Sequence, residues 1–415
     1  MTKFDHSKML PGLLSGEELL GALRNIPVYR PEMREKGTAE RLMALSDIYK
    51  VYLPSTMSVE IYNKLYIAAA MSLQKKGTRE SVLQQGSNYR AMHGGEYRGI
   101  IGGADSFTVI GKSGIGKSSA IEQAIHLICG NEIIETERPY AKIIPCLMVQ
   151  CPFDCSSKGM LLEILRMVDI ALDTKYYSRS QRAGVTTDIL IGTVAQVAIN
   201  NIGLLIIDEI QHVAGHKSGK ILMGMLTQLI NASGISICMV GTPECVPFFE
   251  QTAQLARRSM GLRYSSLPCD EYFREFCELI YGYQYVRTET EVSDAVIEWL
   301  YEHSAGVLSV VVSLIHDAQE IAIFSGREIL DIQALNEAFM RRLTMLHGFV
   351  TPKGKTEKHR KLEKEKSILI ASTKEDIQSS SAYMTIPEMA HKAKDGRMDI
   401  VALLKEQLKV TEVSL

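Results

Sequence analysis

One octapeptide constrains this chain more than any other feature. Residues 111–118, Gly-Lys-Ser-Gly-Ile-Gly-Lys-Ser, match the pattern GxxxxGK[ST] at every constrained position. The run Ser106–Ile110 before it has the character of a strand, and Ser119–Leu127 after it has the pattern of a helix. Strand, glycine-rich loop and helix together predict a phosphate-binding loop, because loop N–H groups and the positive end of the helix both face anions.

The motif assigns a role to each polar side chain. Lys117 is expected on the β and γ phosphates of a nucleotide, and the Ser118 hydroxyl on Mg²⁺. A plain glycine-rich turn is the alternative interpretation. The expected nucleotide-binding residues are Gly111, Lys112, Ser113, Gly114, Ile115, Gly116, Lys117, Ser118 and Ser119.

A second strand ends in two carboxylates about ninety residues after the loop. Leu204–Ile207 is apolar and is followed by Asp208 and Glu209, the arrangement of a Walker B element. Asp208 is expected in the Mg²⁺ shell, with Glu209 as the base that polarises the attacking water. The alternative is a solvated strand end that bears acids. His212 lies close behind, but a surface or packing role fits it better than catalysis.

Two later segments offer further catalytic candidates. Ile237–Val240 is an apolar strand followed by Gly241 and Thr242, so Thr242 is a candidate for contact with the γ-phosphate and the lytic water. Its alternative is a hydroxyl that caps the next helix. The basic pair Arg257 and Arg258 closes a helix-like segment, where a guanidinium could reach a neighbouring subunit's γ-phosphate. A solvated helix end is the alternative there.

The chain's organisation favours an α/β fold. Strand-like runs alternate with helical patterns from Gly99 onward, which predicts a parallel sheet with helices on both faces. The strand-like runs are Ser106–Ile110, Ile143–Gln150, Leu204–Ile207 and Ile235–Val240. Residues 353–366 carry seven basic and three acidic side chains and resemble a solvated linker. The expected division is a helical N-terminal extension (1–94), the α/β core (95–269), a helical lid (270–348), a basic linker (349–369) and a partner-binding segment (370–415).

Composition restricts the class of protein and of partner. With 46% hydrophobic and 23% charged residues the chain can bury a large core, and no apolar run approaches the roughly 20 residues of a membrane span. We therefore expect a soluble, cytoplasmic protein without a membrane partner. Eight cysteines show no CxxC spacing and are expected to be reduced core residues rather than metal ligands.

A net charge of -2 means that nucleic-acid binding needs a local basic patch. Lys158 and the cluster from Lys175 to Arg182, which is interleaved with hydroxyls and aromatics, offer one. Such side chains bind phosphates without reading bases. A solvated loop is the alternative. The candidate DNA-binding residues are Lys158, Lys175, Arg179 and Arg182.

Taken together, the segments GKSGIGKSS, PFDCSSKGMLLEIL, LLIIDEIQH, VGTPE and QLARR resemble AAA+ ATPases of the TnsC and TniB type, which are similar to the Mu B transposition protein. The resemblance covers roughly residues 95 to 340. It implies an AAA+ P-loop core that uses ATP and Mg²⁺, with Lys117 and Glu209 as catalytic residues, Thr242 as sensor 1 and Arg257 or Arg258 as the arginine finger. One departure is the lid segment Ser304–Leu308, which lacks the arginine that many AAA+ proteins place at sensor 2.

The same resemblance implies a homo-oligomer, a ring or a helical filament, on duplex DNA. It would connect a target-selection protein to transposase subunits and disassemble on ATP hydrolysis. A helicase-loader or replication-initiator ATPase is an alternative, as is a signalling or scaffold P-loop NTPase that does not bind DNA. Near the C-terminus, Ile400, Leu403, Leu404 and Leu408 form an apolar stripe that could bind a partner or fold back on the lid.

Overall fold

The computed structural model describes residues 5–76, 78–92, 106–130, 133–137, 140–182, 185–251 and 261–348. The chain divides into two units, residues 1–351 and 352–415, and all the described residues belong to the first. The predicted linker and C-terminal segment therefore lie outside the described residues, as do Arg257 and Arg258.

A mixed, mostly parallel sheet forms the centre of the first unit. Its strand order is β2-β3-β4-β5-β1-β6, and only the β2–β3 pair is antiparallel. The predicted strands are confirmed, whereas β2 and β6 were not predicted. The strands are β1 (Phe107–Gly111), β2 (Ile134–Glu137), β3 (Tyr140–Gln150), β4 (Ile202–Asp208), β5 (Ser236–Gly241) and β6 (Leu262–Tyr264).

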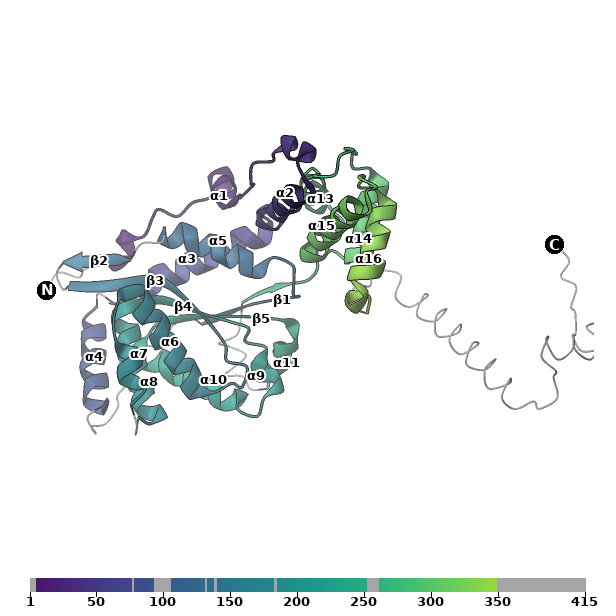
Figure 1. Cartoon of the computed structure of the whole chain (residues 1–415). Coiled ribbons are helices and arrows are strands. Elements are labelled where there is room, and N and C mark those ends of the chain that lie inside the picture. The colour runs from purple at the N-terminus through teal and green to yellow at the C-terminus, as the bar shows by residue number, and fades with distance from the viewer. Residues whose placement is uncertain are drawn as a thin grey trace, which may run out of the picture. The chain divides into compact units, whose positions relative to one another are not determined.

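Helices cover both faces of the sheet, as predicted (Figure 1). Alternate residues of β4 enter different cores: Leu205 and Ile207 pack with the helices of one face, and Leu204 and Ile206 with those of the other. The first face carries α6 (Ser157–Leu172), α8 (Thr187–Asn201) and α10 (Gly219–Ser233), and the second carries α5 (Lys117–Cys129). Shorter elements between them are α7 (Tyr176–Ser180), α9 (His212–Gly215), η4 (Pro243–Cys245) and α11 (Val246–Phe249).

The N-terminal helices share the cores of other parts of the unit. Ile61 and Leu65 of α3 are buried with α5 and the sheet, while Leu45 and Ile48 are buried with the lid. This region contains η1 (His6–Met9), α1 (Gly16–Leu23), η2 (Pro31–Glu35), α2 (Thr38–Leu45), η3 (Ser46–Lys50), α3 (Thr56–Lys76) and α4 (Arg79–Met92). The segment before the sheet thus links the sheet to the lid.

A buried ion pair fastens α2 to the lid. The Arg41 guanidinium donates to both carboxylate oxygens of Glu328, at 2.6 and 2.7 Å, and to the Tyr285 carbonyl at 3.2 Å. Arg41 is 2% exposed. Its guanidinium holds the pKa of the Glu328 carboxyl below its usual range. Removal of either partner would leave a buried charge without its counter-ion. The ion pair therefore stabilises the packing of the N-terminal region against the lid.

The lid is helical, as predicted. Its elements are α13 (Glu271–Tyr281), α14 (Asp294–Ser304), α15 (Leu308–Ser325), α16 (Ile332–Arg342) and η5 (Thr344–Leu346). Among the described residues, α15 alone is long and apolar enough to cross a membrane, and half of it is buried. Val311, Leu314 and Ile315 of α15 lie in the lid core, so its apolar face serves folding.

Candidate nucleotide-binding site

The phosphate-binding loop lies between β1 and α5, as the motif predicts. Gly114 and Gly116 have φ of +80° and +95°, in the left-handed region that favours glycine. Gly116 is the residue that caps α5, so the loop leads directly into the helix N-terminus. This geometry turns main-chain N–H groups and the positive end of α5 toward one point, as a phosphate site requires.

The Lys117 side chain folds back over this loop. Its Nζ donates to the carbonyl oxygens of Gly111 and Lys112, at 2.6 and 2.7 Å. Burial lowers the pKa of the Lys117 ammonium, and the nearby carboxylates of Asp208 and Glu209 oppose that shift. The ammonium group is therefore held inside the loop, where it can exchange carbonyl partners for phosphate oxygens.

Asp208 and Ser118 meet across the site from different elements. The Ser118 hydroxyl donates to Asp208 Oδ2 at 3.4 Å, and Glu209 N–H donates to Asp208 Oδ1 at 2.8 Å. Burial raises the pKa of the Asp208 carboxyl, and Asp208 is 8% exposed. A hydroxyl and a carboxylate are hard oxygen donors of the kind that Mg²⁺ takes beside phosphate, so these residues fit the expected ion.

Glu209, Gln211 and Thr242 form the next part of the site. Glu209 has φ of +58°, which is unusual for a residue other than glycine. Its carboxylate accepts a hydrogen bond from the Gln211 amide, whose oxygen in turn accepts the Thr242 N–H at 3.3 Å. The Thr242 hydroxyl holds the pKa of the nearby Glu244 carboxyl below its usual range. The structure thus brings the predicted base and the predicted sensor threonine together.

A cavity of about 360 Å³ joins these groups. Three parts of the chain enclose it: the loop with the ends of β4 and β5, the N-terminal segment, and the lid. The first part contributes Ser113, Gly114, Ile115, Gly116, Lys117, Ser118, Ser119, Asp208, Glu209, Gln211, Gly241 and Thr242. The N-terminal segment contributes Ile48, Tyr49, Val51, Tyr52, Leu53, Ser55, Met57 and Ser58, and the lid Tyr272, Phe276, Leu308, Ser309, Val312 and Ser313.

The lid touches the phosphate-binding loop directly. Ser309 N–H donates to the Gly114 carbonyl at 3.0 Å, and a Cβ added to Gly114 would lie 2.2 Å from the Ser309 hydroxyl. Gly114 is therefore needed both for its left-handed backbone and for this close approach. The lid lines the cavity with Ser309 and Ser313, and none of the described lid residues in that lining is an arginine.

His212 packs against the loop that follows β3. Its Nδ1 lies 3.3 Å from the Cys151 carbonyl, and its ring makes an edge contact with Phe153. The predicted packing role fits these contacts. Cys151 and Cys155 are buried without a disulfide, as most of the cysteines are, but Cys269 is exposed and does not belong to the core.

The four predicted DNA-binding residues are all exposed. Lys158 lies in the first turn of α6, whereas Lys175 precedes α7, which follows the other end of α6. A helix rises 1.5 Å per residue, so roughly 22 Å separates the two ends of α6. Arg179 and Arg182 lie with Lys175. The structure therefore divides the predicted surface into one basic residue near β3 and a basic cluster at the far end of α6.

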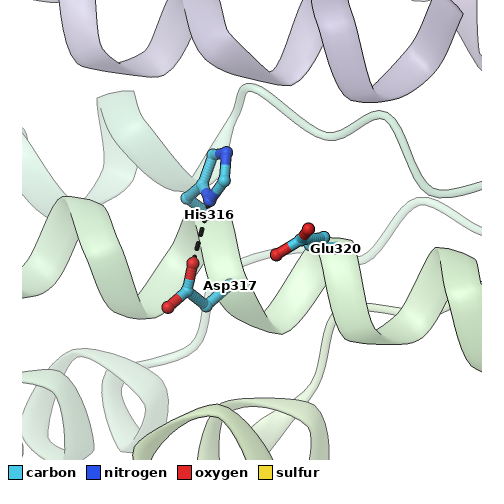
Figure 2. A group of neighbouring side chains, drawn as sticks. All are labelled: His316, Asp317 and Glu320. Carbon is cyan, nitrogen blue, oxygen red and sulfur yellow. Dashed lines mark hydrogen bonds and ion pairs between the residues drawn. The ribbon is translucent and has the colours of Figure 1, made fainter. Parts of the chain in front are cut away.

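A separate group of potential metal ligands lies on α15. Ligand atoms of His316, Asp317 and Glu320 lie within 4.8 Å of one another (Figure 2). His316 Nδ1 is 3.0 Å from the Asp317 carboxylate, and Glu320 forms an ion pair with Arg342 at 3.3 Å. Each of these groups has a partner, either within the group or in Arg342, and we assign no ion to them.

The order of the strands defines the class of this protein. The phosphate-binding loop follows β1, the acidic pair follows β4 and the threonine follows β5, which lies between β4 and β1. With the helical lid, this arrangement is the P-loop NTPase fold of the AAA+ type. Residues 103–265 match the model of a family described as the bacterial TniB protein, so the resemblance predicted from the motifs is confirmed over this segment.

Solved structures with similar folds come from distant proteins. The Aeropyrum pernix ORC1 protein in complex with DNA has 13% identity and a TM-score of 0.43, over 63% of this chain and 64% of that one. The chain thus spans slightly less than two thirds of that protein. Drosophila ORC bound to DNA has 12% identity and a TM-score of 0.44, over 82% and 73%. A Thermotoga maritima RuvB mutant has 11% identity and a TM-score of 0.34, over 80% and 85%. No curated protein sequence matched.

Several residues of the site were not predicted from the sequence. Gln211 lies in the segment LLIIDEIQH but had no predicted role, and the lid serines carry no motif. Four N-terminal residues also reach the cavity from a region without a predicted role: Tyr49, Val51, Tyr52 and Leu53. The signal for Gln211 was its place in LLIIDEIQH, two residues after Glu209. Nothing in the pattern of the N-terminal segment indicates that it lines this cavity.

Proposed function

We propose that this protein is an ATP-dependent, DNA-binding regulator of transposition. It assembles on duplex target DNA, links a target-selection protein to transposase subunits and disassembles when ATP is hydrolysed. The observation that carries the proposal is the enclosed cavity of the phosphate-binding loop, Asp208, Glu209 and Thr242, within a core that matches the TniB family. Cytoplasmic localisation belongs to the same proposal.

In this proposal ATP occupies the cavity. Its phosphates face the loop and Lys117, and its base faces the apolar side chains of the N-terminal segment, among them Ile48 and Val51. Bound Mg²⁺ would neutralise charge on the β and γ phosphates, with Ser118 and Asp208 as its protein ligands. Glu209 polarises the water, and Thr242 contacts the γ-phosphate and that water.

The cavity also explains how nucleotide state could reach the rest of the molecule. Ser309 of the lid is bonded to Gly114 of the loop, and the N-terminal segment is bonded to the lid through Arg41. A change at the phosphates can therefore shift the lid and the N-terminal segment together, which alters the surfaces available for assembly. Oligomerisation as a ring or a filament is proposed on this basis.

Sequence-independent contact with the DNA backbone is assigned to Lys158, Lys175, Arg179 and Arg182, all of them exposed. The division into N-terminal extension, core, lid, linker and C-terminal segment is proposed with the boundaries given above. The C-terminal segment, 370–415, is proposed to bind transposase or another protein of the element.

The ATPase rate with and without duplex DNA tests this function. We expect DNA to stimulate turnover, and a non-hydrolysable ATP analogue with duplex DNA to produce large particles in light scattering. Turnover that DNA does not change, with no DNA-dependent particles, would favour a signalling or scaffold NTPase. Stimulated turnover without any recruitment of transposase would favour a helicase loader or replication initiator.

A further inference from the structure

The Gln211 side chain joins Glu209, two residues before it, to Thr242, thirty-one residues after it. Its amide nitrogen donates to Glu209 Oε2, and its amide oxygen accepts the Thr242 N–H at 3.3 Å. Both ends of the amide are thus engaged, one by the predicted base and the other by the end of β5. Gln211 itself carries no charge, and although it lies in the segment LLIIDEIQH, the sequence assigns it no role.

The backbone around this amide leaves just enough room for it. A Cβ added to Gly241 would lie 2.8 Å from Ile210 Cγ2 and 3.0 Å from Gln211 Oε1. Ile210 N–H donates to the Val240 carbonyl at 2.9 Å, which holds the turn after β4 against β5. A larger residue at position 241 would push the Gln211 amide away from Thr242, so the close contact depends on this glycine.

Glu209 needs an orienting partner because its side chain is exposed and its backbone is left-handed, with φ of +58°. A free glutamate side chain samples many rotamers, whereas a general base must keep one oxygen beside its water. The Gln211 amide nitrogen donates a hydrogen bond to Oε2 of Glu209. The other carboxylate oxygen remains available to accept a hydrogen bond from water.

We propose that Gln211 is a positioning residue for hydrolysis: it holds the Glu209 carboxylate in a fixed relation to Thr242 at the end of β5. The proposal rests on the function proposed above, in which Glu209 activates water. It adds a mechanical consequence: when β5 shifts relative to β4, the Gln211 amide couples the position of the Glu209 carboxylate to that of Thr242. Gln211 acts through Glu209 and not on the phosphates.

Two substitutions separate the two ends of the amide. Gln211→Ala removes both contacts, whereas Gln211→Glu keeps the length and the acceptor toward Thr242 N–H but cannot donate to Glu209. For each variant we expect kcat to fall on the order of tenfold or more, the loss typical of partners that orient a reacting group. The affinity for a fluorescent ATP analogue and the Tm should stay at the wild-type values. Wild-type kcat in Gln211→Glu would overturn the proposal.

A double-mutant cycle with Glu209→Gln tests whether Gln211 acts through Glu209. In the Glu209→Gln background the Gln211→Ala change should cause no further loss of kcat, because its target no longer functions as a base. A further loss equal to that in the wild-type background would overturn the positioning role. Gln333→Ala, on the exposed face of α16, is the matched control and should retain wild-type turnover.

The same measurements distinguish this proposal from the proposed function. A wild-type protein without ATP turnover, alone or on duplex DNA, would remove both. Wild-type turnover that neither Gln211 variant changes would remove the positioning role and leave the proposed function intact.

Discussion

Lys117 and Glu209 line one cavity but belong to different steps of the proposed reaction. Lys117→Ala removes the ammonium that faces the phosphates, so ATP affinity should fall by roughly 3 kcal/mol, or about a hundredfold. Glu209→Gln keeps the shape of the site and removes only the base. It should bind ATP normally while kcat falls by about 10² to 10⁴. Equilibrium binding and steady-state turnover measure the two effects.

Unfolding curves of both variants are the necessary control, because Lys117 is buried and its loss could disturb the loop. If Glu209→Gln hydrolyses ATP at the wild-type rate, Glu209 is not the base. If Lys117→Ala binds ATP with unchanged affinity while folded, the phosphates are bound elsewhere.

For single residues, the sequence predicts the members of the site that belong to motifs and few others. Lys117, Ser118, Asp208, Glu209 and Thr242 meet around one cavity, as expected from motifs at the ends of parallel strands. Their roles stay predictions. Gln211 and Ser309 could not be predicted, because their partners are set by how the turn after β4 and the lid approach the loop. Such approaches depend on tertiary packing and have no local pattern.

At the scale of the elements, a contact between α3 and α8 should make the free energy of unfolding depend on pH. Lys76 Nζ, at the end of α3, donates to the carbonyls of Ala198 and Ile199 near the end of α8, both at 2.7 Å. Burial lowers the pKa of Lys76 to about 7. A neutral amine still has two N–H groups, and the two carbonyls accept both.

The sign of the effect follows from proton linkage. In the unfolded chain the pKa of a lysine is about 10.4. Between pH 7 and that value the unfolded chain binds a proton that the folded protein lacks, so the free energy of unfolding rises with pH, by up to about 1.4 kcal/mol per unit. Urea unfolding at pH 7, 8 and 9 should show this gain in the wild type and in Lys75→Met, and not in Lys76→Met. Parallel pH profiles of the wild type and Lys76→Met would contradict it.

The basic cluster around α7 gives the prediction for DNA. Combined substitution of Lys175, Arg179 and Arg182 by alanine should weaken binding equally on all duplex sequences. It should also reduce the slope of log K against log salt by about 2 to 3, since each phosphate contact contributes about 0.9. Fluorescence anisotropy at several salt concentrations measures both quantities.

Alanine at the exposed residues Lys8, Arg24 and Lys36 removes the same charge from the N-terminal segment and serves as the control. Lys158→Ala, tested alone, shows whether the other end of α6 shares the DNA surface. An unchanged affinity and slope in the triple variant would place the DNA site elsewhere, with the basic segment 353–366 as the next candidate.

Strands with long apolar runs were predictable, whereas the two edge strands were not. β4 is buried along its whole length, and its apolar run is apparent in the sequence. β2 has the sequence Ile-Glu-Thr-Glu and β6 is Leu-Arg-Tyr, so neither has the apolar run of an interior strand. Such strands form because a neighbouring strand offers hydrogen-bonding partners, which is information that the local sequence lacks.

For the molecule as a whole, the proposed assembly makes a prediction about the charge around the cavity. Among the described residues that line it, Lys117 supplies the only cationic side chain, and the lid contributes serines but no arginine. Charge that develops on the γ-phosphate during hydrolysis is commonly stabilised by a further guanidinium. Arg257 and Arg258, outside the described residues, are the candidates that a neighbouring subunit could supply.

Mixing two inactive variants tests this sharing of the active site. The double change Arg257→Ala and Arg258→Ala should leave ATP affinity near the wild-type value and reduce assembly-dependent turnover by about 10³ or more, the scale of a missing arginine finger. Glu209→Gln protein binds ATP and keeps both arginines but lacks the base. In mixed assemblies, intact cavities of the arginine variant receive a guanidinium from a Glu209→Gln neighbour, so turnover should return and peak near equal proportions. If mixtures stay at the background rate while light scattering shows that the two variants assemble together, each cavity is complete within one subunit.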